Sequence, residues 1–108
     1  MVEYTLQLDS IFGSLADPTR RDILRQVGPR ELSIGEIAAH YDLTFAAVSK
    51  HLKILEKAKL VIKRRRGKQQ LVRLSPEALT SATDYLESYR QLLEERLDSL
   101  EDYLERSK

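Results

Sequence analysis

Cysteine is absent from this chain of 108 residues. A chain without cysteine has no disulfide bond, no thiolate metal ligand and no cysteine nucleophile. Only two histidines and four glycines are present, so a catalytic centre has few of its usual components. No apolar run approaches the roughly 20 residues of a transmembrane helix, and residues 1–10 lack the apolar core of a signal peptide. We therefore expect no enzyme active site, no metal site, no cofactor and no membrane partner.

Charge is distributed unevenly along a chain whose formal net charge is only +1. Residues 48–75 carry ten basic and one acidic side chain, whereas residues 76–108 carry nine acidic and four basic ones. The hydrophobic fraction of 42% and the charged fraction of 32% suit a folded globular chain, and the length suits a single domain over residues 1–108. A basic block in a nearly neutral chain favours a local surface that binds a polyanion.

Spacings of three and four residues between apolar side chains predict a first helix within residues 1–16. The apolar positions on this helix face are Tyr4, Leu8, Ile11, Phe12 and Leu15. Asp17 and Pro18 match the N-cap and first position of a second helix, which we expect to end at Gly28.

Residues 34–58 fit a helix-turn-helix, in which a second helix crosses closely over the first. Ser33 and Glu36 match a capping box at the start of the first helix, and Thr44 is the expected cap of the second. The positions predicted to face inward are Ile34, Ile37, Ala38, Tyr41, Leu43, Val48, Leu52, Ile54 and Leu55. Asp42 occupies the turn position between the two helices. Aspartate suits this position, because it tolerates left-handed backbone geometry better than most residues do. A helical hairpin in a small bundle would show the same pattern.

Residues 60–74 predict a β-hairpin. Short β-favouring runs flank a polar centre, and Gly67 can supply the positive φ of a tight turn. The polar centre carries Lys63, Arg64, Arg65, Arg66 and Lys68. A helix in the major groove, with a basic hairpin on the neighbouring phosphates, is the arrangement of a winged helix-turn-helix. The alternative is a solvated hairpin whose charges only prevent pairing with other strands.

Residues 76–106 predict one long helix, with Ser75 and Pro76 as its starting signal. At a rise of 1.5 Å per residue it would be about 45 Å long, more than a small head can cover. We expect the first and last helices to form a homodimer interface, although the two could instead pair within one chain. The expected interface residues are Leu8, Ile11, Phe12, Leu15, Leu86, Tyr89, Leu93, Leu97, Leu100 and Leu104.

The start of the second helix of the helix-turn-helix is the expected reading surface for DNA. Ser49 and Lys50 can reach base edges or phosphates, whereas Phe45 and the two alanines after it offer apolar contact to thymine methyl groups. His51 lies next to a core position, so packing within the protein is equally open to it. The expected DNA-binding residues are Thr44, Phe45, Ala46, Ala47, Ser49, Lys50, His51, Lys53, Arg64, Arg65, Arg66 and Lys68.

Three segments, Leu15–Arg21, Ala47–Leu55 and Leu60–Val61, resemble the ArsR/SmtB family of bacterial and archaeal transcriptional regulators. The most specific of them reads Ala-Val-Ser-Lys-His-Leu-Lys-Ile-Leu, after an Asp-Pro-Thr-Arg-Arg opening in the first segment. The resemblance covers about residues 8–105 and implies a homodimeric winged-helix protein that binds an operator and usually represses transcription. It also implies a recognition helix around Ser49.

The metal-sensing members of that family carry a cysteine motif in the first helix of the helix-turn-helix, or aspartate and histidine ligands in the last helix. Here residues 31–36 contain no cysteine and residues 76–108 no histidine, so a tight zinc or copper site is not expected. The chain resembles the branch that does not sense metals, whose members share no common inducer.

The expected fold is thus mainly α with a small β-hairpin, a winged helix-turn-helix whose long N- and C-terminal helices form a dimer interface. The expected function is a prokaryotic, cytoplasmic, nucleoid-associated repressor that binds a pseudo-palindromic operator in double-stranded DNA as a homodimer and blocks polymerase. A small-molecule effector is open, and nothing in the sequence identifies one. The alternative function is a winged-helix module that binds RNA or a protein through the same basic hairpin.

Overall fold

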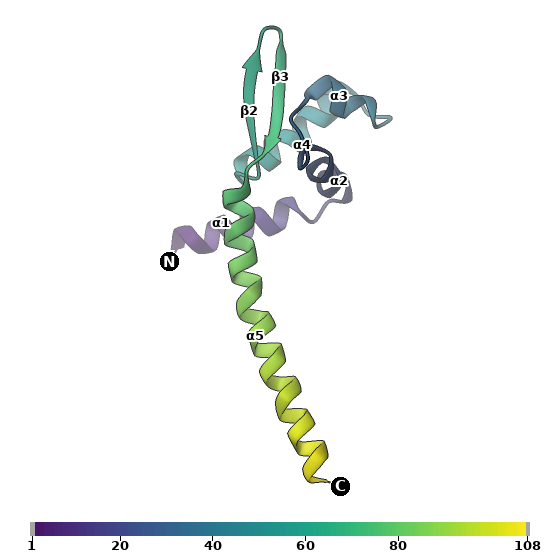
Figure 1. Cartoon of the computed structure of the whole chain (residues 1–108). Coiled ribbons are helices and arrows are strands. Elements are labelled where there is room, and N and C mark those ends of the chain that lie inside the picture. Colours follow the sequence, from purple (N-terminus) through teal and green to yellow (C-terminus); the bar gives the residue numbers. More distant parts are fainter. Residues whose placement is uncertain (1, 108) are drawn as a thin grey trace.

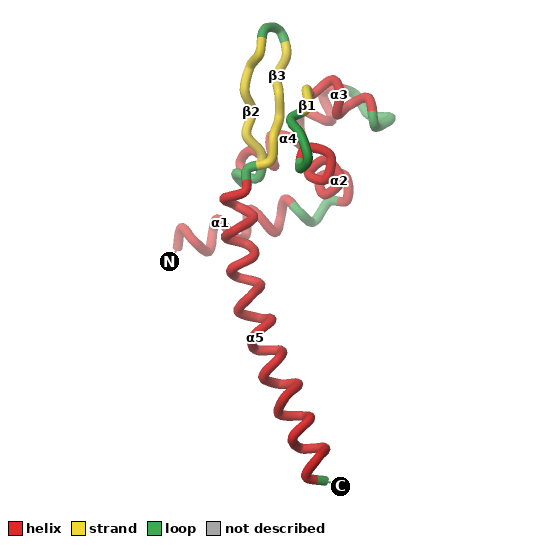
Figure 2. The backbone as a smooth tube through the Cα atoms, in the orientation of Figure 1, coloured by secondary structure: helices red, strands yellow, loops and turns green. Residues whose placement is uncertain are grey.

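The computed structural model describes residues 2–107, with side chains described from residue 6 onward. The elements in chain order are α1 (Val2–Ser14), α2 (Pro18–Val27), β1 (Leu32–Ser33), α3 (Ile34–Ala39), α4 (Phe45–Lys57), β2 (Val61–Arg66), β3 (Gln69–Leu74) and α5 (Pro76–Arg106). Helices α1 to α4 and the strands form a head, from which α5 extends as a single rod (Figure 1). Figure 2 shows the β2–β3 hairpin projecting from this head in the opposite direction. The mainly helical fold with a basic hairpin is as expected from the sequence.

Side-chain caps set the starts of three helices, as the sequence predicts. The Asp17 carboxylate accepts a hydrogen bond from the Thr19 amide at 2.7 Å, at the start of α2. Before α3, the Ser33 hydroxyl accepts from the Glu36 amide at 3.1 Å, and the Glu36 carboxylate accepts from the Ser33 amide at 3.0 Å. The Thr44 hydroxyl accepts from the amide three residues later at 3.1 Å, at the start of α4. These bonds satisfy amides that a helix leaves unpaired at its first turn.

The start of α5 differs from the prediction in one respect. Ser75 occupies the cap position, but its hydroxyl makes no capping hydrogen bond. Its amide instead donates to the Leu60 carbonyl at 2.9 Å, and the residue is buried. The start of α5 is therefore tied to the beginning of the hairpin by the backbone.

The turn between α3 and α4 is built without a left-handed residue. Among residues 2–107, Lys59 is the only non-glycine residue with a positive φ, so the predicted left-handed geometry of Asp42 is wrong. His40 still has right-handed helical angles, with φ −80° and ψ −9°. The connection from α3 to α4 spans residues 40–44, which is long enough to reverse the chain without such a residue.

A tyrosine–carboxylate pair joins this turn to α2. The Tyr41 hydroxyl donates to Asp22 at 2.5 Å, and the Gln26 amide nitrogen donates to the Tyr41 oxygen at 2.6 Å. Burial, with the Asp22 carboxylate next to it, raises the pKa of Tyr41, while the hydrogen bond from Tyr41 lowers the pKa of Asp22. The pair holds the turn in a fixed position against α2.

Helix α4 ends in a hydrogen-bonded turn that leads directly into β2. The Leu60 amide donates to the Leu55 carbonyl at 3.0 Å, and the Lys59 amide donates to the Glu56 carbonyl at 2.9 Å. This is a Schellman motif, whose left-handed position is usually glycine but here is Lys59, with φ 62°. Leu55 and Leu60 are both fully buried, so their packing keeps Lys59 in this conformation.

The sheet has three antiparallel strands in the order β1-β3-β2. The hairpin pairs Val61 with Leu74 at its base and Arg66 with Gln69 at its tip, and Gly67 has the predicted positive φ of 63°. Both strands extend through the polar centre, beyond the apolar runs that predict them. Strand β1 is not predicted, because two residues are too few to show an alternating pattern.

All five helices and the sheet contribute to one core, whose buried members are Ile11, Ile23, Val27, Leu32, Ile34, Ile37, Val48, Leu52, Leu55, Ala58, Leu60, Val61, Val72, Ala78 and Ala82. Two positions predicted to face inward do not: Leu43 is 40% exposed and Ile54 is 44% exposed. Leu43 precedes α4. Ile54 is the neighbour of the buried Leu55, and its side chain lies at the edge of the buried face of α4. Tyr4 lies outside the residues whose side chains are described. Within residues 2–107, none of the helices combines the length and apolar character needed to cross a bilayer.

We predict opposite effects on the free energy of unfolding for alanine at Gly67 and at Gly13. A new Cβ would meet no atom within 4 Å at either position, so the backbone conformation decides each effect. At Gly67 the positive φ places the Cβ against its own backbone, which costs about 1–2 kcal/mol. Within α1, alanine at Gly13 removes backbone entropy from the unfolded chain and stabilises by about 0.5–1 kcal/mol. Urea unfolding at one protein concentration measures both effects, and shifts of the same sign would contradict the assigned backbone geometry.

Candidate nucleic-acid interface

Helix α4 has one buried and one exposed face. Val48, Leu52 and Leu55 are fully buried, and they anchor the helix on the core. None of the predicted DNA-binding residues of this segment is buried: Thr44, Phe45, Ala46, Lys50 and Lys53 are exposed, and Ala47, Ser49 and His51 are partly exposed. Phe45, at the start of the helix, is 59% exposed and leaves an apolar side chain open to contact.

The cations of the β2–β3 hairpin differ in whether they form ion pairs. Arg65, Arg66 and Lys68 are exposed near the tip and form no ion pair with any side chain described, those of residues 6–107. Arg64 instead folds back to the loop before β1, where its guanidinium donates two hydrogen bonds to the Glu31 carboxylate at 2.6 and 2.8 Å. This hydrogen bond from Arg64 lowers the pKa of Glu31.

Lys63 is also paired, although it lies closer to the hairpin base. Its ammonium is 3.5 Å from the Glu56 carboxylate of α4, and its side chain is only 13% exposed. Lys63 and Arg64 therefore fasten the hairpin to the head, and the cations beyond them remain available to an anion.

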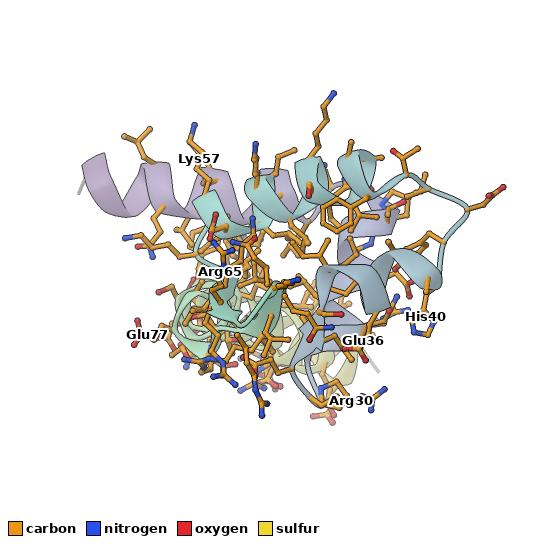
Figure 3. All side chains as sticks on the ribbon, turned by 90° about the horizontal axis from the view of Figure 1, so that it is seen from above. Arg30, Glu36, His40, Lys57, Arg65 and Glu77 are labelled. Carbon is orange, nitrogen blue, oxygen red and sulfur yellow. The ribbon has the colours of Figure 1, made fainter. Side chains whose placement is uncertain are left out.

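An open groove of about 520 Å³ separates α4 from the hairpin. Besides the N-terminal turn of α3, the groove is lined by Phe45, Ser49, Arg65, Lys68, Gln69 and Gln70. Figure 3 shows the molecule from above, with Arg65 between the hairpin and α4. Two predicted residues of the helix and two of the wing thus line one concave surface, and the other predicted DNA-binding residues lie outside its lining.

Sequence reasoning misses Gln69 and Gln70, because uncharged side chains do not stand out in a basic block. The strand register places Gln70 opposite Arg65 and Gln69 opposite Arg66. The Gly67 turn signal, followed by residue-by-residue pairing of the two strands, is the pattern that identifies them.

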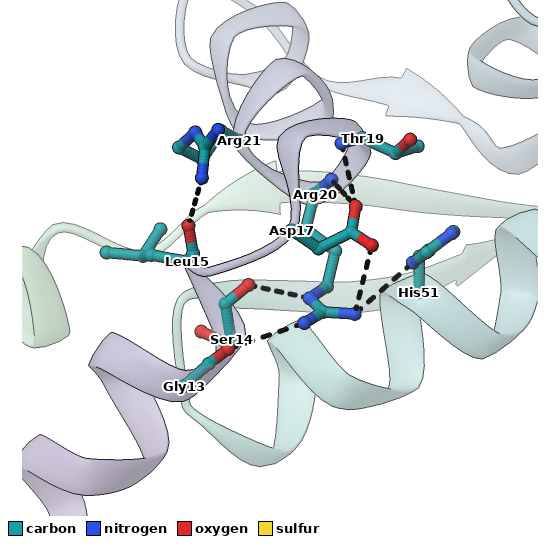
Figure 4. Close-up of polar contacts among 8 residues, drawn as sticks. All are labelled: Gly13, Ser14, Leu15, Asp17, Thr19, Arg20, Arg21 and His51. Atoms are coloured by element: carbon teal, nitrogen blue, oxygen red, sulfur yellow. Dashed lines mark hydrogen bonds and ion pairs between the residues drawn. The ribbon is translucent and has the colours of Figure 1, made fainter.

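Sequence reasoning also misses Arg20, which connects three helices (Figure 4). Its Nε donates to the Ser14 carbonyl at 2.6 Å and another guanidinium nitrogen donates to the Gly13 carbonyl at 3.3 Å, both at the end of α1. The guanidinium also lies 3.9 Å from Asp17 and 3.5 Å from the His51 Nδ1. Hydrogen bonds from the Arg20 and Thr19 amides, and the charges of His51 and Arg20, lower the pKa of Asp17.

The Arg20 contact decides where His51 is held. One ring nitrogen faces Arg20 and the end of α1, while the ring remains partly exposed beside the outward face of α4. Arg20 thereby links the position of α4 to that of α1.

The predicted dimer residues on α5 are all exposed, with side chains 53–59% accessible: Leu86, Tyr89, Leu93, Leu97, Leu100 and Leu104. Those on α1 are different. Ile11 is fully buried and Leu8 is 7% exposed, so both side chains are buried within the head and offer little surface to a partner. Phe12 and Leu15 are partly buried, and the Phe12 ring lies 5.8 Å from that of Tyr85. The spacing of apolar residues in α1 predicts which side chains share a face of the helix. It does not predict whether that face packs on the core or lies at the surface.

Residues 2–107 contain no group of three or more histidine, cysteine, aspartate or glutamate side chains arranged to hold a metal ion.

Comparison with known proteins places this geometry in a family. A family model described as a helix-turn-helix domain matches residues 15–64. The HTH-type transcriptional regulator Rv2034 of Mycobacterium tuberculosis is 34% identical over 98 residues, covering 83% of this chain and 92% of that protein. The transcriptional repressor SdpR of Bacillus subtilis is 28% identical over 79 residues, covering 73% and 88%.

Solved structures show the same arrangement. The crystal structure of the ArsR family transcriptional regulator RHA00566 superposes with a TM-score of 0.78 at 28% identity, covering 83% of this chain and 93% of that one. The solution structure of the homodimeric winged helix-turn-helix DNA-binding domain of Mb0332 from Mycobacterium bovis, a possible ArsR-family regulator, has a TM-score of 0.68 at 25% identity, with 84% and 86% covered. The exposed α4 with a basic wing beside it, and the similarity of the chain to these regulators over most of its length, establish that this chain belongs to the ArsR family and is a winged helix-turn-helix, DNA-binding regulator of transcription.

Proposed function

We propose that this protein acts as a homodimer that binds a pseudo-palindromic operator and represses transcription by covering a promoter. The observation that carries the proposal is the single groove that the exposed face of α4 and the cationic tip of the wing share. A helix fits the major groove of B-DNA, and the phosphate chain beside that groove then runs toward the wing.

In this arrangement α4 reads the bases. The Ser49 hydroxyl and the Lys50 ammonium reach base edges, while Phe45, Ala46 and Ala47 contact thymine methyl groups. The Thr44 hydroxyl is engaged as the helix cap, and we assign Thr44 to contact with the phosphates beside the start of α4. His51 and Lys53 lie farther along the helix and contact phosphates.

The wing supplies affinity without reading sequence. Arg65, Arg66 and Lys68 neutralise phosphates and release bound counterions, so binding weakens as salt increases. Arg64 reaches DNA only by exchanging the Glu31 carboxylate for a phosphate. Each wing therefore presents three cations outside ion pairs and a fourth, Arg64, that binding can recruit.

The dimer follows from the exposed apolar face of α5. Monomeric proteins rarely leave such a large apolar stripe in water, and the homodimeric structure of Mb0332 shows that a chain of this architecture pairs. Phe12 and Leu15 complete the interface from α1. A two-fold axis brings two α4 helices to major grooves about 34 Å apart, one helical turn of DNA.

Repression is the outcome we propose, because a bound dimer excludes polymerase from the DNA it covers, and SdpR is itself named a repressor. A DNA-bound regulator works in the cytoplasm, associated with the nucleoid. A ligand that releases the operator would have to bind one arrangement of the two heads better than the other.

Selection of bound duplexes from a random library, at two salt concentrations, tests the proposal. We expect enrichment of an inverted repeat whose half-sites are about 10 base pairs apart. Binding without any enriched sequence, lost at the higher salt concentration, would contradict operator recognition. In that event RNA and protein partners of the same basic surface are the functions to test.

Replacing Arg65 and Arg66 together by alanine should weaken binding to every duplex by a similar factor. The slope of log affinity against log salt concentration should become shallower by about 1–2 units, because up to two phosphate contacts are lost. Fluorescence anisotropy over a salt series measures this slope. Arg96→Ala with Arg106→Ala removes the same charge from α5 and serves as the control. An unchanged slope in the wing variant would contradict the wing assignment.

Ser49→Ala should separate reading of bases from contact with phosphates. Loss of a base contact weakens binding to the selected operator by about tenfold, or 1.4 kcal/mol, and leaves binding to an unrelated duplex nearly unchanged. Competition between the two duplexes measures the ratio. Equal losses on both would show that Ser49 contacts only the backbone.

A further inference from the structure

The imidazole ring of His51 has one nitrogen in contact with the protein and one that faces solvent. Nδ1 lies 3.5 Å from a guanidinium nitrogen of Arg20. Nε2 has no hydrogen-bond partner among residues 2–107, yet it is not one of the buried atoms that lack a partner, so it is accessible to solvent. Figure 4 shows this second nitrogen pointing away from Arg20. His51 therefore connects the interior of the head to the surface of α4.

The contact with Arg20 determines which nitrogen of the neutral ring carries the proton. A guanidinium group donates hydrogen bonds and cannot accept them, so the Nδ1 of His51 is the acceptor. A neutral imidazole has one donor and one acceptor nitrogen, which places the ring proton on Nε2. Arg20 thus makes His51 a hydrogen-bond donor on the side of the ring that faces solvent.

Other contacts hold Arg20 in place, and with it the ring of His51. The Arg20 side chain is only 14% exposed. Its Nε donates to the Ser14 carbonyl at 2.6 Å, and another guanidinium nitrogen donates to the Gly13 carbonyl at 3.3 Å. The nitrogen that faces His51 also lies 3.9 Å from the Asp17 carboxylate. Because a guanidinium group is planar, the bonds at its other positions fix the direction of the N–H that meets His51.

His51 lies on the side of α4 away from the wing. An α-helix turns by about 100° per residue, so His51 and Ser49 are about 200° apart around the helix axis. Ser49 lines the groove that α4 shares with the wing, and His51 is not part of that lining. A helix bound in the major groove of B-DNA has a phosphate chain on each of its sides. With the wing at one chain, His51 faces the other.

We propose that Arg20 is a positioning residue for DNA binding, which orients His51 so that its Nε2–H donates to a phosphate on the side of α4 away from the wing. The proposal deepens the proposed function and rests on the role of α4 as the reading helix. Phosphate oxygens accept hydrogen bonds, so they match the tautomer of His51 that Arg20 selects and not the other one.

This contact adds a hold on the DNA that the wing does not supply. Helix α4 is then bound to phosphates on both of its sides, by cations of the wing on one side and by His51 on the other. A helix held on both sides cannot rotate about its axis in the groove, so Ser49 and Lys50 keep a fixed direction toward the bases. Since Arg20 is bonded to the end of α1, the orientation of His51 also depends on the position of α1.

The tautomer of His51 can be measured in the parent chain, without any substitution at Arg20. Long-range proton–nitrogen correlation spectra at about pH 9, where free imidazoles are neutral, distinguish the protonated ring nitrogen from the unprotonated one. The chain has two histidines, and the other one, His40, is exposed. We expect His51 to carry its proton on Nε2 alone, whereas the signals of His40 are averaged over both tautomers. The His40→Gln variant assigns the two sets of signals.

The Arg20→Met variant shows whether Arg20 selects this tautomer. Methionine fills a similar space without an N–H, so the His51 signals should shift toward the averaged values of His40. A proton on Nδ1 in the parent chain, or His51 signals in the parent that are averaged like those of His40, would overturn the proposal. This measurement on the parent decides the matter if Arg20→Met does not fold.

Affinity for the operator duplex selected from the library, measured by fluorescence anisotropy at the same pH, tests the effect on DNA. Arg20→Met should weaken binding about fivefold, the typical contribution of one hydrogen bond, and His51→Ala should weaken it by a similar factor. His51→Gln should keep most of the affinity, because the amide can turn its NH2 toward the phosphate without Arg20. In the His51→Gln background, Arg20→Met should therefore have little further effect.

Arg21→Met is the matched control. Arg21 is exposed and donates to the Leu15 carbonyl at 2.7 Å, but it forms no hydrogen bond with His51 among the side chains of residues 6–107. The control removes the same charge and a comparable backbone contact, so its effect should be the same in the parent and in the His51→Gln background. If Arg20→Met also weakens binding equally in the two backgrounds, Arg20 does not act through His51 and the proposal is wrong.

The same measurements separate this inference from the proposed function. A parent chain that binds no duplex would overturn both. An operator that the parent and His51→Ala bind equally well would overturn the phosphate contact of His51, and with it the positioning role of Arg20, while the reading of bases by α4, tested at Ser49, would stand.

Discussion

The burial of one face of α4 is the constraint on which the rest of the structure depends. Val48, Leu52 and Leu55 have no exposed surface, and each such side chain contributes roughly 1.5–3 kcal/mol when it leaves water. Because these three point into the head, the residues between them must point outward, and the helix cannot rotate without exposing its anchor. The Thr44 cap and the Lys59 turn then determine where α4 begins and ends.

The basic residues of the hairpin fall into two groups, those whose ion pairs hold the hairpin on the head and those at the tip that form no ion pair. Arg64 with Glu31, and Lys63 with Glu56, hold the hairpin in place, although exposed pairs of this kind contribute only about 0–1 kcal/mol each. Their main effect is geometric, because Arg64 joins the hairpin to the loop before β1 and Lys63 joins it to α4. The free cations at the tip are then concentrated on the side where a phosphate chain would pass, while the acidic residues of α5 stay on the other end of the molecule.

Short-range chemistry made most of this architecture predictable. Cap residues such as Asp17, Ser33 and Thr44 act on amides two or three positions away, so their effects can be inferred without knowledge of the tertiary structure. The family resemblance adds the winged arrangement. Tertiary contacts are where prediction fails: β1 forms only because β3 lies beside it, and Lys59 is left-handed only because Leu55 and Leu60 pack together. The burial of Ile11, the exposure of Ile54 and the contacts of Arg20 likewise depend on which helices meet in space.

Hydroxyl-radical footprinting of the dimer on its selected operator tests the central claim most directly, because it locates α4 and the wing on DNA at once. The account predicts protection centred on two sites about 10 base pairs apart on one face of the duplex, with further protection in the flanking sequence where the wings lie. The Arg65→Ala and Arg66→Ala variant should lose the flanking protection and keep the central one. A single protected site, or protection that the wing variant leaves unchanged, would contradict the arrangement of reading helix and wing described for this protein.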